Sequence, residues 1–374
     1  MRQKTIRRFG WSLKKLVFIS AISAAIILGA CTRESSDRLV TIDIAANLHC
    51  DDTGDLTTLM QPEWAFIPEL TDSTMLGYPQ VVGFDGNVVY LNEQTRMLRY
   101  DGNSGKCLSS FDNSGEGPGH YLPELRSAYK VPMKSEWMVY EYNSMMRYLF
   151  TAEGTPVSET NVGKKFTILP CGDGWLTLNE RTASKKVFTR LSPDFEVIDS
   201  IIAPFPTHVM KEGISHSPLL SVAGKNVIFL ETDAPADTLF AFGPTGGMKP
   251  LAAIELGNLK MPQFESYETY KAEKNKYLWY QLTVAGNLAI VFYNFDGKYT
   301  VQIYSLTDGM LKYSHASTTI ETAGLPFEID GNTVYGFPMN FNGDDAMYII
   351  VPGEFTASVT GHDESNPMII KVRV

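Results

Sequence analysis

The feature that most constrains this fold is a turn that recurs along the chain, each time followed by a short apolar run typical of a strand. Turn-forming residues cluster near residues 86, 135, 173, 225, 286 and 331, roughly 40 to 60 residues apart. Asp85-Gly86-Asn87, for example, separates two β-branched runs, as a tight turn between antiparallel strands does. Long amphipathic helical patterns are nearly absent. We therefore expect six repeats of a four-stranded antiparallel meander.

A four-stranded meander cannot bury both of its faces alone. Copies stacked radially around an axis bury each other and leave only short, protected edges. The sequence therefore predicts an all-β fold, a six-bladed β-propeller of four-stranded antiparallel blades, over residues 60–374. A sandwich is disfavoured because it needs only about 100 residues. A strand within Glu63–Leu70 is expected to pair with the last blade and close the ring.

One interval is too long for strands alone. Aromatic residues at near-helical spacing predict a short helical insertion near residues 262–280, and they include Tyr267, Tyr270 and Trp279. Tyr and Trp favour interfaces, so one interpretation is a surface for a ligand or a partner. The alternative is a helix that lies over the propeller with its aromatic side chains buried, and the sequence leaves both open.

The amino terminus has the pattern of a secretory leader. Six basic residues precede an apolar run from Leu16 to Leu28, which is short for a membrane-spanning helix. The run ends in Leu28-Gly29-Ala30-Cys31, which resembles the lipobox of bacterial lipoproteins. This resemblance implies that residues 1–30 are a signal peptide and that Cys31 is acylated, palmitate included, and tethers the chain to a membrane. Residues 31–59 then form a spacer and a leading strand.

The charge of the chain excludes one class of partner. Removing residues 1–30 takes away six basic side chains and no acidic one, so the formal net charge moves from −10 to about −16. Binding of nucleic acid, or of an anionic lipid surface, calls for clusters of Lys and Arg. We therefore expect no nucleic-acid partner and attachment to the membrane through the lipid alone.

A glycine-rich segment between the first two predicted blades carries the strongest family resemblance. Its structural residues are Gly115, Gly117, Pro118, Gly119 and Tyr121. In a lipoprotein of this length with repeated Asp-Gly-Asn turns, the segment resembles the six-bladed β-propeller lipoproteins of Bacteroidetes, related in fold to NHL and TolB-like propellers. His120 stands where that family has an acid. The resemblance implies a cell-envelope protein, and we expect the outer membrane, with the periplasmic or surface face left open.

No catalytic residue, metal ligand or cofactor is predicted. The six histidines are scattered, no Gly-x-Ser-x-Gly occurs, and the acidic pairs do not have the spacing of a calcium loop. Cys50, Cys107 and Cys171 allow one disulfide and one free thiol, or three buried thiols, and the pairing cannot be read from spacing. A loop with Phe341, Asp344 and Asp345 suits stacking and hydrogen bonding, so it joins Tyr267, Tyr270 and Trp279 as the predicted binding surface.

Two functions follow from these patterns. The favoured one is a membrane-anchored extracytoplasmic lipoprotein propeller that acts as a binding or scaffold module of the cell envelope, with a glycan, peptide or envelope protein as partner. The alternative is a calcium-dependent propeller enzyme, a lactonase-like hydrolase or a glycan lyase.

Overall fold

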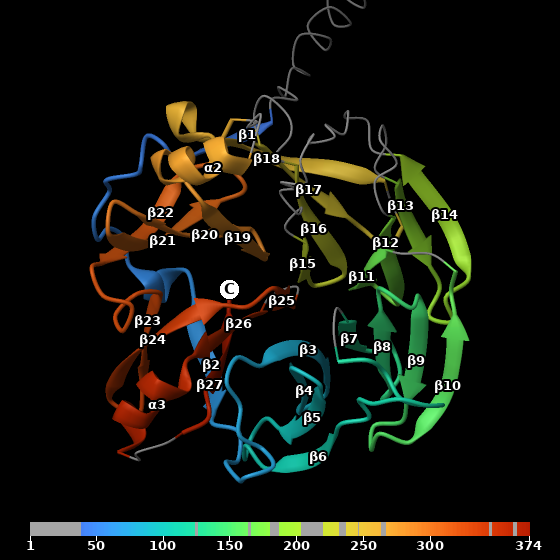
Figure 1. The fold of residues 1–374 in the computed structure, drawn as a ribbon. Coiled ribbons are helices and arrows are strands. Elements are labelled where there is room, and N and C mark those ends of the chain that lie inside the picture. The colour runs from blue at the N-terminus through green and yellow to red at the C-terminus, as the bar shows by residue number, and fades with distance from the viewer. Residues whose placement is uncertain are drawn as a thin grey trace, which may run out of the picture. The chain divides into compact units, whose positions relative to one another are not determined.

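Antiparallel meanders dominate the structure of this chain, a computed structural model (Figure 1). It describes residues 39–123, 126–163, 166–179, 187–202, 220–231, 237–245, 247–262, 267–343, 346–361 and 365–374. The chain divides into two units, Met1–Leu39 and Val40–Val374, and every element named below belongs to the second. The predicted signal peptide and Cys31 lie outside the described residues.

Five regular blades each consist of four consecutive strands paired in antiparallel ladders. Blade 1 contains β3 (Gln80–Asp85), β4 (Val88–Glu93), β5 (Arg96–Asp101) and β6 (Cys107–Phe111). Blade 2 contains β7 (Arg126–Lys130), β8 (Trp137–Glu141), β9 (Met146–Phe150) and β10 (Pro156–Asn161). Blade 3 contains β11 (Phe166–Cys171), β12 (Gly174–Asn179), β13 (Val187–Leu191) and β14 (Val197–Ile202).

Blades 4 and 5 repeat the same arrangement. Blade 4 contains β15 (Leu220–Ala223), β16 (Asn226–Glu231), β17 (Asp237–Phe242) and β18 (Met248–Glu255). Blade 5 contains β19 (Tyr280–Ala285), β20 (Leu288–Phe295), β21 (Lys298–Ser305) and β22 (Leu311–Ser317). The first strands of neighbouring blades contact each other, β3 with β7, β7 with β11, β11 with β15, and β15 with β19, so they form the inner ring. The predicted propeller of four-stranded blades is confirmed.

The sixth predicted blade does not form a four-stranded meander, so the prediction of six such blades is wrong, and the described residues form five. The end of the chain makes a five-stranded sheet in the order β2, β27, β26, β24, β23. Its strands are β23 (Leu325–Ile329), β24 (Asn332–Pro338), β26 (Ala346–Val351), β27 (Met368–Arg373) and β2 (Gln61–Phe66). β24 pairs with β26 only through Phe337 and Pro338, because the chain then leaves the sheet.

The segment between β24 and β26 crosses to other blades. Its short strand β25 (Phe341–Asn342) pairs in parallel with β15 of blade 4. The Asn342 side chain is 1% exposed and donates to Thr283 Oγ1 of blade 5 at 2.9 Å and to the Val284 carbonyl at 3.2 Å. It also donates to the Met339 carbonyl at 3.1 Å. These bonds hold the segment against inner strands of blades 4 and 5, which is why it does not extend the ladder of its own sheet.

The two ends of this unit are joined by β2, as predicted. β2 pairs antiparallel with β27 from Gln61 opposite Arg373 to Phe66 opposite Ile369. The side chain of Asn366 is fully buried. It donates hydrogen bonds to the carbonyls of Pro68, Glu69 and Thr74 and accepts one from the backbone amide of Leu76. A further strand, β1 (Val40–Asp43), pairs in parallel with β18, so the leading strand also joins the propeller.

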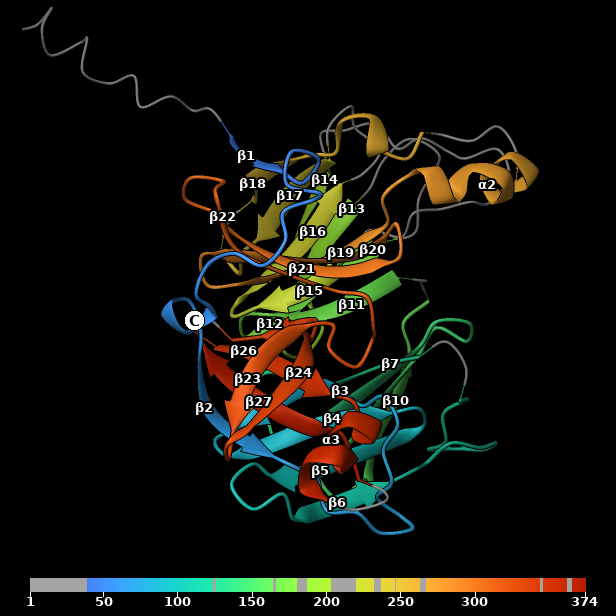
Figure 2. The ribbon, with the colours of Figure 1, turned by 90° about the vertical axis from the view of Figure 1, so that its left-hand side faces the viewer.

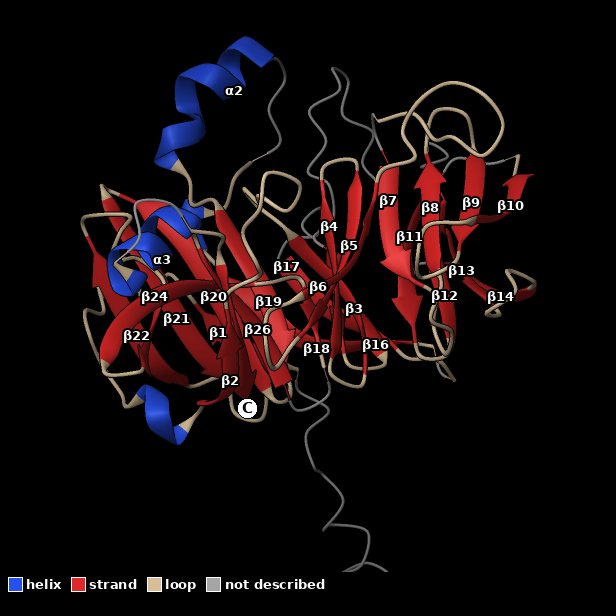
Figure 3. Cartoon of the chain, turned by 90° about the horizontal axis from the view of Figure 1, so that it is seen from below, coloured by secondary structure: helices blue, strands red, loops and turns tan. Residues whose placement is uncertain are grey.

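In the described residues, helices are few and short. The predicted helical insertion is confirmed as α2 (Tyr267–Glu273), with the 3-10 turns η2 (Gly257–Leu259) before it and η3 (Lys274–Lys276) after it. Figures 2 and 3 show α2 standing out beyond the ends of the strands. The sequence did not predict α3 (Gly353–Thr360) or η1 (Leu56–Thr58). No helix in the described part of the chain is long and apolar enough to cross a membrane.

All three cysteines of the described chain are free thiols, so no disulfide joins any two of Cys50, Cys107 and Cys171. Burial raises the pKa of the Cys171 thiol to about 11, which keeps it protonated and unreactive at neutral pH. Cys171 therefore behaves as a small core residue of blade 3.

The glycine-rich segment connects β6 to β7. Gly117 and Gly119 have φ angles of 110° and 76°, which favour glycine, and the Gly119 amide donates to Glu159 Oε2 of β10 at 2.8 Å. Tyr121 ends the segment and is fully buried. Its hydroxyl donates to the Thr95 carbonyl at 2.6 Å and accepts from the Asn113 amide at 3.0 Å. The segment thus fastens blade 1 to blade 2.

We expect Tyr121→Phe to lower the free energy of unfolding by about 1–3 kcal/mol, because it leaves the Asn113 amide and the Thr95 carbonyl without this partner. Denaturant titration measures the change. Tyr78→Phe is the matched control, since Tyr78 is 78% exposed, and it should shift the value by less than about 0.5 kcal/mol. Equal effects of the two substitutions would contradict the role of Tyr121.

Candidate binding site between blades 2 and 3

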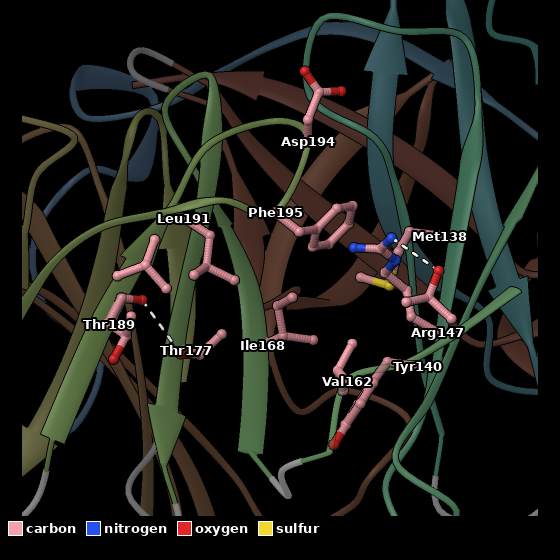
Figure 4. Close-up of a pocket in the computed structure, with 12 residues that line it drawn as sticks. Met138, Tyr140, Arg147, Val162, Ile168, Thr177, Thr189, Leu191, Asp194 and Phe195 are labelled. Carbon is pink, nitrogen blue, oxygen red and sulfur yellow. Dashed lines mark hydrogen bonds between the residues drawn. The ribbon is translucent and has the colours of Figure 1, made fainter. Parts of the chain in front are cut away.

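A cavity of about 300 Å³ lies between blades 2 and 3 (Figure 4). We call it the inter-blade pocket. Blade 2 contributes residues of β8, β9 and β10, and blade 3 contributes residues of β11 to β14 and the turn before β14. The lining is mainly apolar, with a few polar groups: Met138, Tyr140, Arg147, Thr160, Val162, Ile168, Thr177, Thr189, Leu191, Asp194, Phe195 and Val197.

Two of the side chains on the blade 3 wall of the pocket are short. Aromatic rings fill the neighbouring spaces, with Trp137 and Phe150 between blades 1 and 2, and Phe188 and Phe229 between blades 3 and 4. Part of the wall that blade 3 presents to this pocket consists of two threonines, Thr177 and Thr189. Thr177 donates to the Thr189 carbonyl at 3.3 Å, so the hydroxyl is satisfied within the blade. Small side chains on one wall leave a volume that the opposite wall does not fill.

The pocket opens outward, away from the inner strands. Its rim includes Thr160 of β10 and Val197 of β14, the outermost strands of their blades, and Val197 is 66% exposed. β10 and β14 lie along one margin of the propeller in Figure 1. Deeper in the pocket, Met138 and Ile168 are buried. A ligand could therefore enter from the side of the molecule and place an apolar group inward.

Arg147 is the one cation that lines this pocket. Its side chain is half-buried, and its Nε atom is buried without a hydrogen-bond partner. Nη2 donates to Thr160 Oγ1 at 3.3 Å, which is a long bond to a neutral group. Burial lowers the pKa of Arg147, and the charge of Asp194 partly opposes this shift. An arginine remains charged despite such a shift, so the pocket contains an incompletely compensated positive charge.

An aromatic stack holds this guanidinium in place. Arg147 lies over the ring of Phe195, with its Cζ atom 3.9 Å from the ring centroid. On blade 3 the Phe195 ring also stacks on Trp175, with centroids 5.2 Å apart and planes 17° apart. Phe195 has a φ of 69°, a conformation that a bulky residue rarely adopts. The turn fixes it, because the Phe195 amide donates to the Ser192 carbonyl at 2.9 Å.

Asp194 does not neutralise Arg147 directly. Its carboxylate forms an ion pair with Lys134 Nζ at 3.1 Å and is largely exposed. The charge of a solvated, already paired carboxylate is strongly screened. The guanidinium therefore stays available to an acceptor in the pocket.

A second cavity, of about 420 Å³, lies where the first strands of blades 1 to 4 turn into their second strands. We call it the axial cavity. Phe341 of β25 lines it together with Phe84, and the two ring centroids are 6.1 Å apart. Lys130 also lines it, and burial lowers the pKa of this amine, opposed by the charge of Asp85. Its walls are otherwise mostly Gly and Pro turns, which offer few side-chain groups for recognition.

The predicted binding surface is only partly represented in the structure. Tyr267 and Tyr270 lie on α2, but their side chains, like Asp344 and Asp345, fall outside what the structure describes. Trp279 follows η3 and is 48% exposed. Phe341 lines the axial cavity and not an outer loop surface. Whether these residues form one surface stays a prediction.

The inter-blade pocket was not predicted from the sequence. Its lining residues extend from Met138 to Val197 and come from two blades, so no local motif marks it. One signal was present: Arg147 interrupts an otherwise apolar and aromatic run in Met146–Phe150. Among the described residues, no cluster of three His, Cys, Asp or Glu side chains could hold a metal ion.

Two solved structures from Bacteroides are similar to this chain. A protein of Bacteroides fragilis described as exported has a TM-score of 0.61 and 12% identity, over 90% of this chain and 99% of its own. A member of the DUF4221 family from Bacteroides vulgatus has a TM-score of 0.53 and 11% identity, over 84% of this chain and 97% of its own. At such identities the likeness shows the fold alone. Neither protein-family models nor curated proteins match the sequence.

A double-mutant cycle tests the Arg147–Phe195 stack. Arg147→Gln and Phe195→Leu should be coupled by about 0.5–2 kcal/mol in the free energy of unfolding, the range of a cation–π contact. Leucine keeps an apolar side chain and the same backbone strain at φ 69°, so the cycle isolates the ring. Arg373→Gln, at the exposed end of β27, combined with Phe195→Leu should be additive within about 0.5 kcal/mol. Additivity of the first pair would disprove the stack.

Proposed function

We propose that this protein is a non-catalytic binding module of the cell envelope that takes a small ligand with an apolar body in the inter-blade pocket. The observation that carries the proposal is the pocket itself, a cavity of about 300 Å³ with an apolar lining and a few converging polar groups. This is the usual composition of small-molecule sites. Its walls are strands of a rigid scaffold, so the site is formed before a ligand arrives.

Location in the envelope is part of the same proposal. The lipobox-like end of the leader at Cys31 supports lipid anchoring, and the outer membrane is the expected membrane. The similar Bacteroides fragilis protein is described as exported, which is consistent with a position outside the cytoplasm. A glycan, a peptide or an envelope protein could still bind elsewhere on the propeller, at the predicted surface with Tyr267, Tyr270 and Trp279.

Filling the pocket tests the binding function. Val162→Trp places a large ring in the cavity, so it should weaken binding of the neutral fluorescent probe N-phenyl-1-naphthylamine at least about tenfold. Val157→Trp on β10 is the control, since Val157 is 52% exposed and does not line the pocket. Fluorescence titration of the purified protein measures both, with melting temperatures to verify folding. No saturable binding by the unsubstituted protein, or equal binding by both variants, would count against the pocket.

Cys31→Ser tests the anchor. We expect the variant to lose labelling by a palmitate analogue and to move from the membrane fraction to the soluble fraction, because the acylated thiol is gone. Cys50→Ser is the matched control and should remain labelled and in the membrane fraction. If Cys31→Ser is still acylated and sediments with membranes, the lipoprotein assignment is wrong.

A further inference from the structure

We propose that the ligand of the inter-blade pocket is an amphipathic carboxylate, with its acid group bound by Arg147 and its apolar chain buried between blades 2 and 3. This inference rests on the proposed binding function and specifies the class of ligand. It starts from the one charged donor in the pocket lining whose Nε atom is buried without a partner. A buried charged donor that makes no hydrogen bond costs free energy. A carboxylate is the acceptor that fits the guanidinium fork.

The geometry separates the two parts of such a ligand. Arg147 and Thr160 lie opposite each other on β9 and β10, close to the outer rim. Figure 4 shows Ile168 and Leu191 across the space of the pocket from the Arg147 side chain. Both belong to the buried apolar cluster between blades 2 and 3. A chain with an acid at one end would place its carboxylate near solvent and its methylene groups against this cluster, which gains free energy from every buried methylene.

The stack makes Arg147 suitable for this task. Phe195 covers one face of the guanidinium, and Trp175 supports Phe195 from behind. The group therefore loses little freedom when it binds an acceptor, because its orientation is already fixed. Thr160 Oγ1 accepts only the long bond from Nη2, so its own hydroxyl proton is free to point at the same carboxylate.

Because the chain has a negative net charge, a preference for a carboxylate over a neutral ligand would indicate a local cation site. A formal charge of −10 disfavours anions at long range, so a protein without a specific cation site should bind a neutral chain at least as well as a carboxylate. A preference for the acid must then come from a local cation. Within this pocket that cation is Arg147.

Three probes with the same chain distinguish the outcomes: decanoate, decanol and decyltrimethylammonium. Isothermal titration calorimetry of the unsubstituted protein should show decanoate binding at least about tenfold more tightly than decanol, with the cation weakest. In Arg147→Gln the decanoate preference over decanol should fall to about one, because the charged partner of the carboxylate is gone. Arg373→Gln, which removes an equal charge on the remote β27, should keep the preference.

The results separate this inference from the binding function. If decanoate and decanol bind equally well to the unsubstituted protein, the carboxylate inference fails and the apolar pocket stands. If none of the three binds and the neutral naphthylamine probe does not bind either, the proposed function fails as well. If Arg147→Gln keeps the full preference for decanoate at an unchanged melting temperature, the acid is bound elsewhere and Arg147 is not its partner.

Discussion

The pairing of β2 with β27 is the contact on which the rest of this propeller depends. Blades stacked around an axis bury their faces only if the first and last sheets also meet, because otherwise each would expose one apolar face and an unpaired edge. Phe66 of β2 and Ile369 of β27 belong to the same buried cluster as Leu98 of blade 1. The side chain of Asn366 then ties the start of blade 1 to the end of the chain by bonds that span 290 residues or more. Loss of this closure would expose apolar surface on both sides of the gap.

The last sheet is irregular because of the contacts that its two edges make. Its outer edge is taken by β2, so the sheet already has a closing strand. At the inner side of the sheet, the chain after Pro338 leaves the sheet and pairs with β15. This places Phe341 against Phe84 of blade 1. Tyr348 of β26 stacks on the same Phe84 ring at 4.0 Å. Aromatic contacts of this kind connect the last sheet to blade 1 where a regular inner strand would otherwise lie.

Much of the fold could be predicted because most of the first turns contain a glycine that marks them in the sequence. Gly86, Gly172, Gly224, Gly286 and Gly331 all have positive φ angles between the first two strands of their units. Such a residue specifies the turn from the sequence alone, whatever surrounds it. The last unit has the same signature at Gly331, so the sequence gives no warning that Asn342 finds its partners 58 and 59 residues away on blade 5. Long-range polar contacts have no local pattern, and the prediction of a sixth regular blade failed there.

The inter-blade pocket could not be predicted for the same reason. Two energetically unfavourable features lie next to each other in its wall. Phe195 adopts an unfavourable backbone angle, and Arg147 buries a donor atom without a partner. A methionine at position 147 and a glycine at position 195 would remove both penalties and still suit the strand and the turn. Proteins retain local conflicts of this kind mainly where a site needs them. The two penalties are in direct contact on the wall of a single cavity, which is the place where the ligand is proposed to bind.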